Sequence, residues 1–127
     1  LDFWASWCGP CRQANPQVVE IYNKYKDKGF TVYSVSLDGV DERNKAQMSP
    51  EQYQAQMDAS KSKWLAAITQ DKLAWTSHVS DLKKWGSSAA QQYGVNSIPQ
   101  TFLIGKDGKI VAVNPRNTLE EELLKVL

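Results

Sequence analysis

The stretch Trp7-Cys8-Gly9-Pro10-Cys11 decides how the rest of this chain is interpreted. Two residues separate the cysteines, so the pair spans one helical turn and its sulfur atoms can meet in a small disulfide. The apolar segment Leu1–Ala5 before it predicts a strand, and the pattern from Cys8 to about Lys28 predicts a helix. The sequence therefore places Cys8 at the start of a helix and Cys11 one turn inside it.

The expected position of Cys8 favours redox chemistry. A helix N-terminus presents unpaired N–H groups and the positive end of the dipole, which stabilise a thiolate. Lowering the pKa of a thiol from ~8.5 to ~7 takes about 2 kcal/mol and raises its thiolate fraction at neutral pH to about half. We expect Cys11 to be less exposed and to act as the resolving cysteine. A structural zinc site is the alternative, but the chain has no second cysteine pair and His78 is its only histidine.

The remainder of the chain continues the alternation of strands and helices. The β-branched segment Phe30–Leu37 predicts a second strand and completes a β-α-β unit with the first strand and helix. Further elements are expected as a helix opened by a capping box at Ser49–Gln52, an extended piece around His78–Val79, a short helix at Ser87–Tyr93, strands at Thr101–Ile104 and Lys109–Val113, and a last helix opened by a capping box at Thr118–Glu121. This order predicts an α/β fold in which helices cover both faces of a central mixed sheet.

Length and composition bound the possible functions. The 127 residues fit one domain, and 15 Lys+Arg against 14 Asp+Glu argue against a nucleic-acid surface or a polybasic membrane patch. The longest apolar run, Trp64–Ile68, is far shorter than a membrane span. The sequence lacks an initiator Met and begins as if within a strand, so we expect a further N-terminal segment. Whether that segment holds a signal peptide or a membrane anchor is left open.

Three segments carry a family resemblance. Asp2–Arg12 resembles the active-site segment of thioredoxins almost residue for residue, and Val79–Trp85 and Tyr93–Ile104 look like the TlpA/ResA-like branch of the thioredoxin-like superfamily. The resemblance spans nearly the whole chain except Gly39 to about Lys61. It implies a thioredoxin fold with a helical insertion around residues 39–69. It also implies thiol–disulfide exchange without a cofactor or metal, usually in an extracytoplasmic compartment.

The resemblance assigns roles to individual residues. Asp2 matches the buried acid that thioredoxins place beneath the resolving cysteine for proton transfer. Pro99 matches the family's cis-proline facing the dithiol, which would turn the backbone of Ile98 outward so that an extended substrate can pair with it. The expected substrate-binding surface consists of Trp7, Gly9, Pro10, Ile98 and Pro99, and the expected catalytic residues are Cys8, Cys11 and Asp2.

Two features of this chain depart from the family pattern. Many TlpA/ResA-like proteins have a Glu three residues after the second cysteine, where this chain has Ala14. Proton transfer would then depend on Asp2, as in thioredoxin. The insertion is longer than the corresponding part of thioredoxin, and we expect its apolar stripe of Met57, Trp64 and Ile68 to pack on the sheet.

Three functions are weighed. The leading one is an oxidoreductase that reduces disulfides in partner proteins and is itself returned to the reduced state by a dithiol donor. The reducing direction is favoured because Gly-Pro between the cysteines resembles reducing thioredoxins. A peroxiredoxin-type peroxidase is disfavoured because the Thr it needs before its cysteine is absent from Trp4–Trp7. A redox-responsive binding or sensor domain is the third. We expect a periplasmic or otherwise extracytoplasmic monomer, anchored or not through the N-terminal segment, with a cytochrome c maturation apoprotein as one candidate partner.

Overall fold

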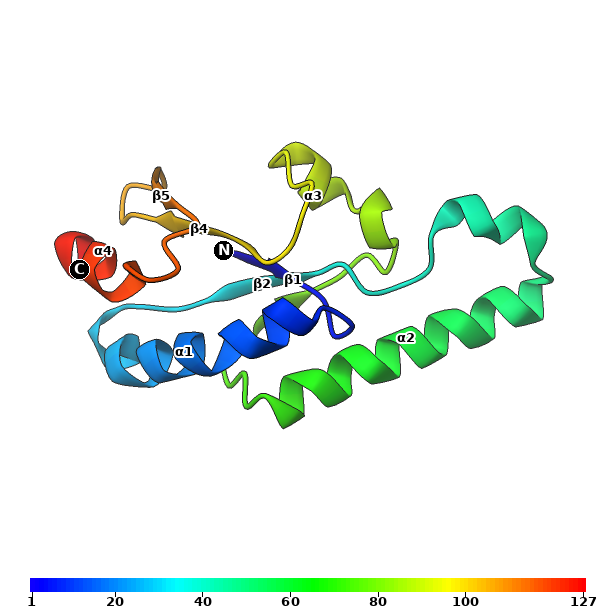
Figure 1. The fold of residues 1–127 in the computed structure, drawn as a ribbon, viewed down its shortest axis with the longest axis horizontal. Coiled ribbons are helices and arrows are strands. Elements are labelled where there is room, and N and C mark those ends of the chain that lie inside the picture. The colour runs from blue at the N-terminus through cyan, green and yellow to red at the C-terminus, as the bar shows by residue number, and fades with distance from the viewer.

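The computed structural model describes all 127 residues and contains a five-stranded mixed sheet of order β3-β2-β1-β4-β5 (Figure 1). Strands β1 (Asp2–Trp4), β2 (Tyr33–Ser36) and β3 (Ser77–Val79) are parallel, whereas β4 (Gln100–Ile104) is antiparallel to β1 and to β5 (Ile110–Val113). The helices are α1 (Gly9–Tyr25), α2 (Pro50–Gln70), α3 (Ser88–Gln92) and α4 (Leu119–Val126), with 3-10 turns η1 (Lys26–Lys28), η2 (Glu42–Gln47) and η3 (Lys84–Gly86). The predicted α/β architecture is confirmed.

Helices cover both faces of the sheet. Helices α1 and α2 lie on one face and α3 lies on the other (Figure 1). Phe3 and Trp4 of β1 are completely buried, and because successive strand residues point to opposite faces, this strand anchors both layers. At the far end of α1, Leu123 of α4 packs with Ile21 and Tyr25 in a smaller apolar cluster. The N-terminal end of α1, where the cysteines lie, thus follows shortly after a fully buried strand of the sheet.

Strand β2 is shorter than predicted. The sequence pattern indicates a strand over Phe30–Leu37, but only Tyr33–Ser36 is strand. On the β3 side the register pairs Tyr33 with Ser77, the first residue of β3, so the residues before Tyr33 have no hydrogen-bonded neighbour in that strand. Backbone pairing, rather than residue type, therefore sets where this strand begins.

One of the two predicted capping boxes is present. The Ser49 hydroxyl accepts the Gln52 N–H at 3.1 Å, and the Gln52 side chain accepts the Ser49 N–H at 3.0 Å. The prediction at Thr118–Glu121 is wrong, because the Thr118 side chain makes no capping hydrogen bond. Thr118 has φ −118° and ψ 11°, outside the extended region that directs an N-cap oxygen at the first helical N–H groups. Three glutamates in the first turn of α4 complement the helix dipole instead.

The expected helical insertion is present as η2 and α2. Trp64 is buried in the main core and Ile68 packs against it, whereas Met57 is only half-buried and Leu65 is exposed. The N-terminal half of α2 projects past the sheet (Figure 1), so its anchorage lies in the C-terminal half. Neither α2 nor any other helix combines the length and the hydropathy needed to cross a membrane.

Candidate active site

Cys8 and Cys11 form a disulfide at the N-terminus of α1, with their Cα atoms 5.2 Å apart. Cys8 is the N-cap residue in an extended conformation, and its sulfur accepts the Cys11 N–H at 3.2 Å. Cys8 is 5% exposed and Cys11 is 1% exposed, so the expected difference in exposure has the right sign but is small. In the reduced state the same N–H group and the helix dipole would stabilise a Cys8 thiolate.

The segment before β4 lies beside the disulfide. The Ile98–Pro99 peptide is cis, which is the geometry that the family resemblance predicts. Cys8 Sγ lies 3.8 Å from the carbonyl oxygen of Ile98. Arg116 donates from Nη2 to the carbonyl oxygen of Pro99 at 2.9 Å, which holds this segment in place.

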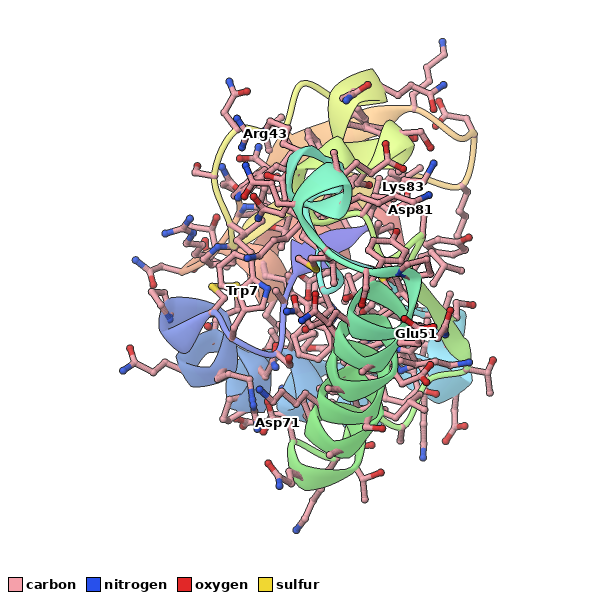
Figure 2. All side chains as sticks on the ribbon, turned by 90° about the vertical axis from the view of Figure 1, so that its right-hand side faces the viewer. Trp7, Arg43, Glu51, Asp71, Asp81 and Lys83 are labelled. Carbon is pink, nitrogen blue, oxygen red and sulfur yellow. A yellow bond between two sulfur atoms is a disulfide. The ribbon has the colours of Figure 1, made fainter.

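The surface next to the disulfide exposes one aromatic ring and two small residues. Trp7 is 49% exposed, and Gly9 and Pro10 are also exposed. The Lys84 ammonium lies 5.8 Å from the centre of the Trp7 ring, within cation–π range. Trp7 can be located on this side of the molecule in Figure 2. A partner that approaches Cys8 would meet this ring.

Asp2 is a buried acid without a hydrogen-bond partner for its carboxyl group. It is 7% exposed. Burial raises the pKa of Asp2 to about 6, because desolvation disfavours the charged carboxylate. Its carboxyl group can therefore take up or release a proton close to neutral pH.

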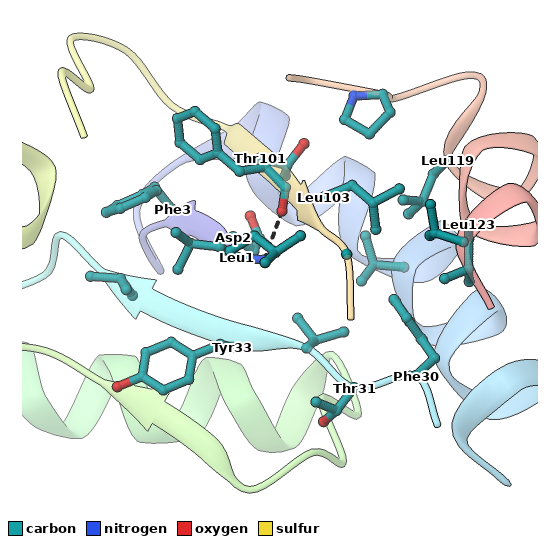
Figure 3. Close-up of a pocket in the computed structure, with 18 of the residues that line it drawn as sticks. Leu1, Asp2, Phe3, Phe30, Thr31, Tyr33, Thr101, Leu103, Leu119 and Leu123 are labelled. Atoms are coloured by element: carbon teal, nitrogen blue, oxygen red, sulfur yellow. Dashed lines mark hydrogen bonds between the residues drawn. The ribbon is translucent and has the colours of Figure 1, made fainter. Parts of the chain in front are cut away.

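A cavity of about 630 Å³ lies along the sheet and does not include either cysteine (Figure 3). Its lining is mostly apolar, with Leu1 and Asp2 between β2 and β4. Tyr33 and Leu103 border it on the two neighbouring strands, so the cavity continues the line of β1. It lies away from the cysteines and gives no support for a ligand site at the dithiol.

Four polar residues around the dithiol were not predicted from the sequence, namely Ser6, Arg12, Asp38 and Asp71. Arg12 donates two hydrogen bonds to Asp71, from Nε to Oδ2 at 2.5 Å and from Nη2 to Oδ1 at 2.9 Å. Burial alone would raise the pKa of Asp71, but hydrogen bonds from Arg12 and Asn15 outweigh it and lower the pKa. The position of Asp38, an acid directly after an apolar strand, weakly indicated that it could lie near the site. Asp71 gave no such indication, because 59 residues separate it from Arg12.

The contacts of His78 are those of a structural residue rather than of a metal ligand or catalytic group. Its Nε2 lies 3.1 Å from the carbonyl oxygen of Leu73, and its ring stacks on Trp75 at 5.6 Å. The structure brings together no cluster of three or more histidine, cysteine or acidic side chains suited to a metal ion. The disulfide is thus the chemically distinctive feature of the molecule.

These observations define a thioredoxin-fold protein with a disulfide-bonded cysteine pair at a helix N-terminus, next to a cis-proline. The Redoxin family profile matches residues 1–127, and the chain belongs to this family. The family resemblance seen in the sequence is thereby confirmed.

Similar proteins are named as thiol–disulfide oxidoreductases. The chain is 32% identical over 130 residues to ResA of Bacillus thuringiensis subsp. konkukian, covering 99% of this chain and 61% of that protein. It therefore spans less than two thirds of this relative. A solved thiol-disulfide oxidoreductase from Bacteroides fragilis is 30% identical with a TM-score of 0.75, over 99% of this chain and 78% of that one. The thioredoxin domain of a thiol-disulfide oxidoreductase from Bacteroides vulgatus is 31% identical with a TM-score of 0.70, over 99% and 76%.

Proposed function

We propose that this chain is the exchange domain of a thiol–disulfide oxidoreductase that reduces disulfides in partner proteins. The observation that carries the proposal is the Cys8–Cys11 disulfide at the N-terminus of α1, with Cys8 Sγ 3.8 Å from the Ile98 carbonyl beside cis-Pro99. The names of the relatives support the same reaction class.

The reaction follows from the positions of the two sulfurs. In the reduced protein the Cys8 thiolate attacks one sulfur of the substrate disulfide, forms a mixed disulfide and releases a substrate thiolate. Cys11 then loses its thiol proton and attacks Cys8 Sγ, which breaks the mixed disulfide and releases the second substrate sulfur as a thiolate. Both substrate thiolates then take up protons from solvent. The Cys8–Cys11 disulfide forms as two electrons pass to the substrate. A dithiol donor returns the protein to the reduced state by the reverse exchange.

The proposal gives the surrounding residues supporting roles. Asp2 accepts the proton of the Cys11 thiol as it attacks, since its raised pKa lets it exchange protons near neutrality. An extended substrate segment pairs with the backbone at Ile98. The surface that receives it consists of Trp7, Gly9, Pro10, Ile98 and Pro99.

The compartment and partner are also part of the proposal. The resemblance to the TlpA/ResA-like branch supports an extracytoplasmic location, and we propose that the domain acts there as a monomer. The apoprotein of a c-type cytochrome is a suitable partner, because its haem-attachment cysteines must be thiols before haem is bound. The Gly-Pro pair between the cysteines favours the reducing direction.

Reduction of insulin by dithiothreitol tests the proposed activity. The wild-type protein should accelerate the reaction, whereas Cys8→Ser should remove the acceleration. Cys11→Ser should accumulate mixed disulfides with partners, and limiting iodoacetamide should label Cys8 before Cys11 in the reduced protein. A wild-type rate equal to that of Cys8→Ser would overturn the proposal and favour a redox-responsive sensor domain.

A further inference from the structure

Ser6 lies in the turn between β1 and α1, two residues before Cys8, and each of its polar groups is engaged. Its backbone N–H donates to Asp38, at 3.1 Å to Oδ2 and 3.3 Å to Oδ1, and its hydroxyl donates to Oδ1 of the same carboxylate. Its carbonyl oxygen accepts a hydrogen bond from Arg12 Nη1 at 3.1 Å. The turn that leads into Cys8 is therefore held through two separate side chains.

Asp38, just after β2, is a buried carboxylate that the proposed exchange steps do not use. It is 1% exposed, and burial of a carboxylate is costly unless donors surround it. The Ser36 hydroxyl supplies a further donor besides Ser6. The carboxylate thus connects the end of β2 to the turn before the nucleophile.

The second side chain, Arg12, connects the same turn to the inserted helix. Arg12 follows Cys11 directly, and Asp71 directly follows α2. Besides its two hydrogen bonds to Arg12, Asp71 accepts one from Asn15 Nδ2 at 2.8 Å. Figure 2 shows Asp71 at the end of α2 where this helix meets α1. Two parallel N–H···O bonds fix orientation as well as distance, so the end of α2 is joined rigidly to the active-site helix.

We propose that Asp38 and Asp71, acting through Ser6 and Arg12, are positioning residues that hold Cys8 against the N-terminus of α1. The inference rests on the proposed function and deepens it. Stabilisation by helix amides falls off within one turn, so a small shift of the turn weakens the contact between Cys8 Sγ and the Cys11 N–H. The inserted helix therefore controls the reactivity of a cysteine to which it contributes no catalytic group.

Charge-conserving variants separate positioning from a simple electrostatic effect. Arg12→Lys keeps the positive charge but loses the planar fork, and Asp71→Glu keeps the negative charge but displaces the carboxylate by one methylene. Lys24→Arg on α1 and Asp58→Glu on α2 are matched controls, because both side chains are exposed and neither contacts the turn. All variants are made in the full-length protein with Cys11→Ser, so that Cys8 is the only thiol of this domain.

The measurement is the rate of iodoacetamide alkylation against pH, with urea unfolding recorded in parallel. Arg12→Lys and Asp71→Glu should raise the midpoint by about half a pKa unit, which lowers the thiolate concentration below the midpoint about threefold. Both controls should superimpose on the parent. Lower stability with an unchanged midpoint would overturn the inference and leave a purely structural ion pair. Arg12→Lys, the milder change, carries the test if Asp71→Glu does not fold.

Alkylation needs no protein partner, so its outcome is independent of the insulin assay. A protein that fails to reduce insulin but shows the shifted midpoint would refute the proposed function alone. A protein that reduces insulin with unshifted midpoints in both variants would refute the positioning role alone.

Discussion

Replacement of Asp2 by asparagine should stabilise the protein relative to wild type at neutral pH. At acidic pH this advantage of the variant over wild type should disappear. Burial raises the pKa of Asp2 from 3.8 to about 6, so the folded state binds this proton more tightly than the unfolded state. A shift of this size corresponds to about 3 kcal/mol. The contribution is fully present below the unfolded pKa and is lost as the pH rises through the folded pKa. Asparagine has no proton to lose, so the stability difference should grow by about 3 kcal/mol across this window.

Urea unfolding of the oxidised full-length protein between about pH 3 and pH 8 measures this difference. Asp41→Asn is a suitable control, because a hydrogen bond from Arg43 lowers the pKa of Asp41 to about 2. Its contribution has the opposite sign, since it is present above the unfolded pKa and is lost only in acid. A stability difference between wild type and Asp2→Asn that does not change with pH would refute the burial argument.

The same variant tests the proposed proton transfer. Asp2→Asn should slow resolution of the mixed disulfide by Cys11 far more than its formation by Cys8, as measured by stopped-flow reduction of a model disulfide between about pH 5 and pH 9. Identical pH profiles for the two proteins would remove Asp2 from the mechanism, whatever the unfolding experiment shows.

Two further predictions concern the framework around the site. Gly39 has φ +120°, and a Cβ there would lie 2.0 Å from the Leu82 backbone, so Gly39→Ala should lower the free energy of unfolding in urea by more than about 1 kcal/mol. A Cβ at Gly86 would lie 3.5 Å from the nearest atom, so Gly86→Ala should lower it less. Equal losses of stability in the two variants would contradict the clash. Ser49→Ala should lower stability by about 1 kcal/mol, because the hydrogen bond from the Gln52 N–H to the Ser49 hydroxyl is lost, and Thr118→Ala should change stability little. The reverse order would contradict the assignment of the two caps.

Local patterns were enough to predict most elements of the fold. The cysteine spacing, the capping box at Ser49 and the strand and turn residues of β4 and β5 are all readable within a few residues. The start of β2 and the cap of α4 were mispredicted for a common reason. In both places the residue types permit the expected structure, but backbone partners or dihedral angles set elsewhere in the fold exclude it.

The candidate active site was predictable only where it is local in sequence or resembles known relatives. Cys8 and Cys11 follow from spacing, and cis-Pro99 follows from the resemblance. Asp38 and Asp71 could not be predicted as neighbours of this turn, because folding alone brings them there, and an acid at a strand end or helix end is ordinarily solvated.

The contacts around Ser6 determine whether this active site can be transplanted as a cassette into another scaffold. A graft of residues 1–12 would carry both cysteines, the turn and Arg12. Asp38 lies 32 residues after Ser6, and Asp71 lies 59 residues after Arg12, so both acceptors would stay behind. An engineered host that received only the motif would lack the hydrogen bonds that fix the turn before the cysteines. A designer who wants the reactivity as well as the sequence must supply two carboxylates at the matching places in the host.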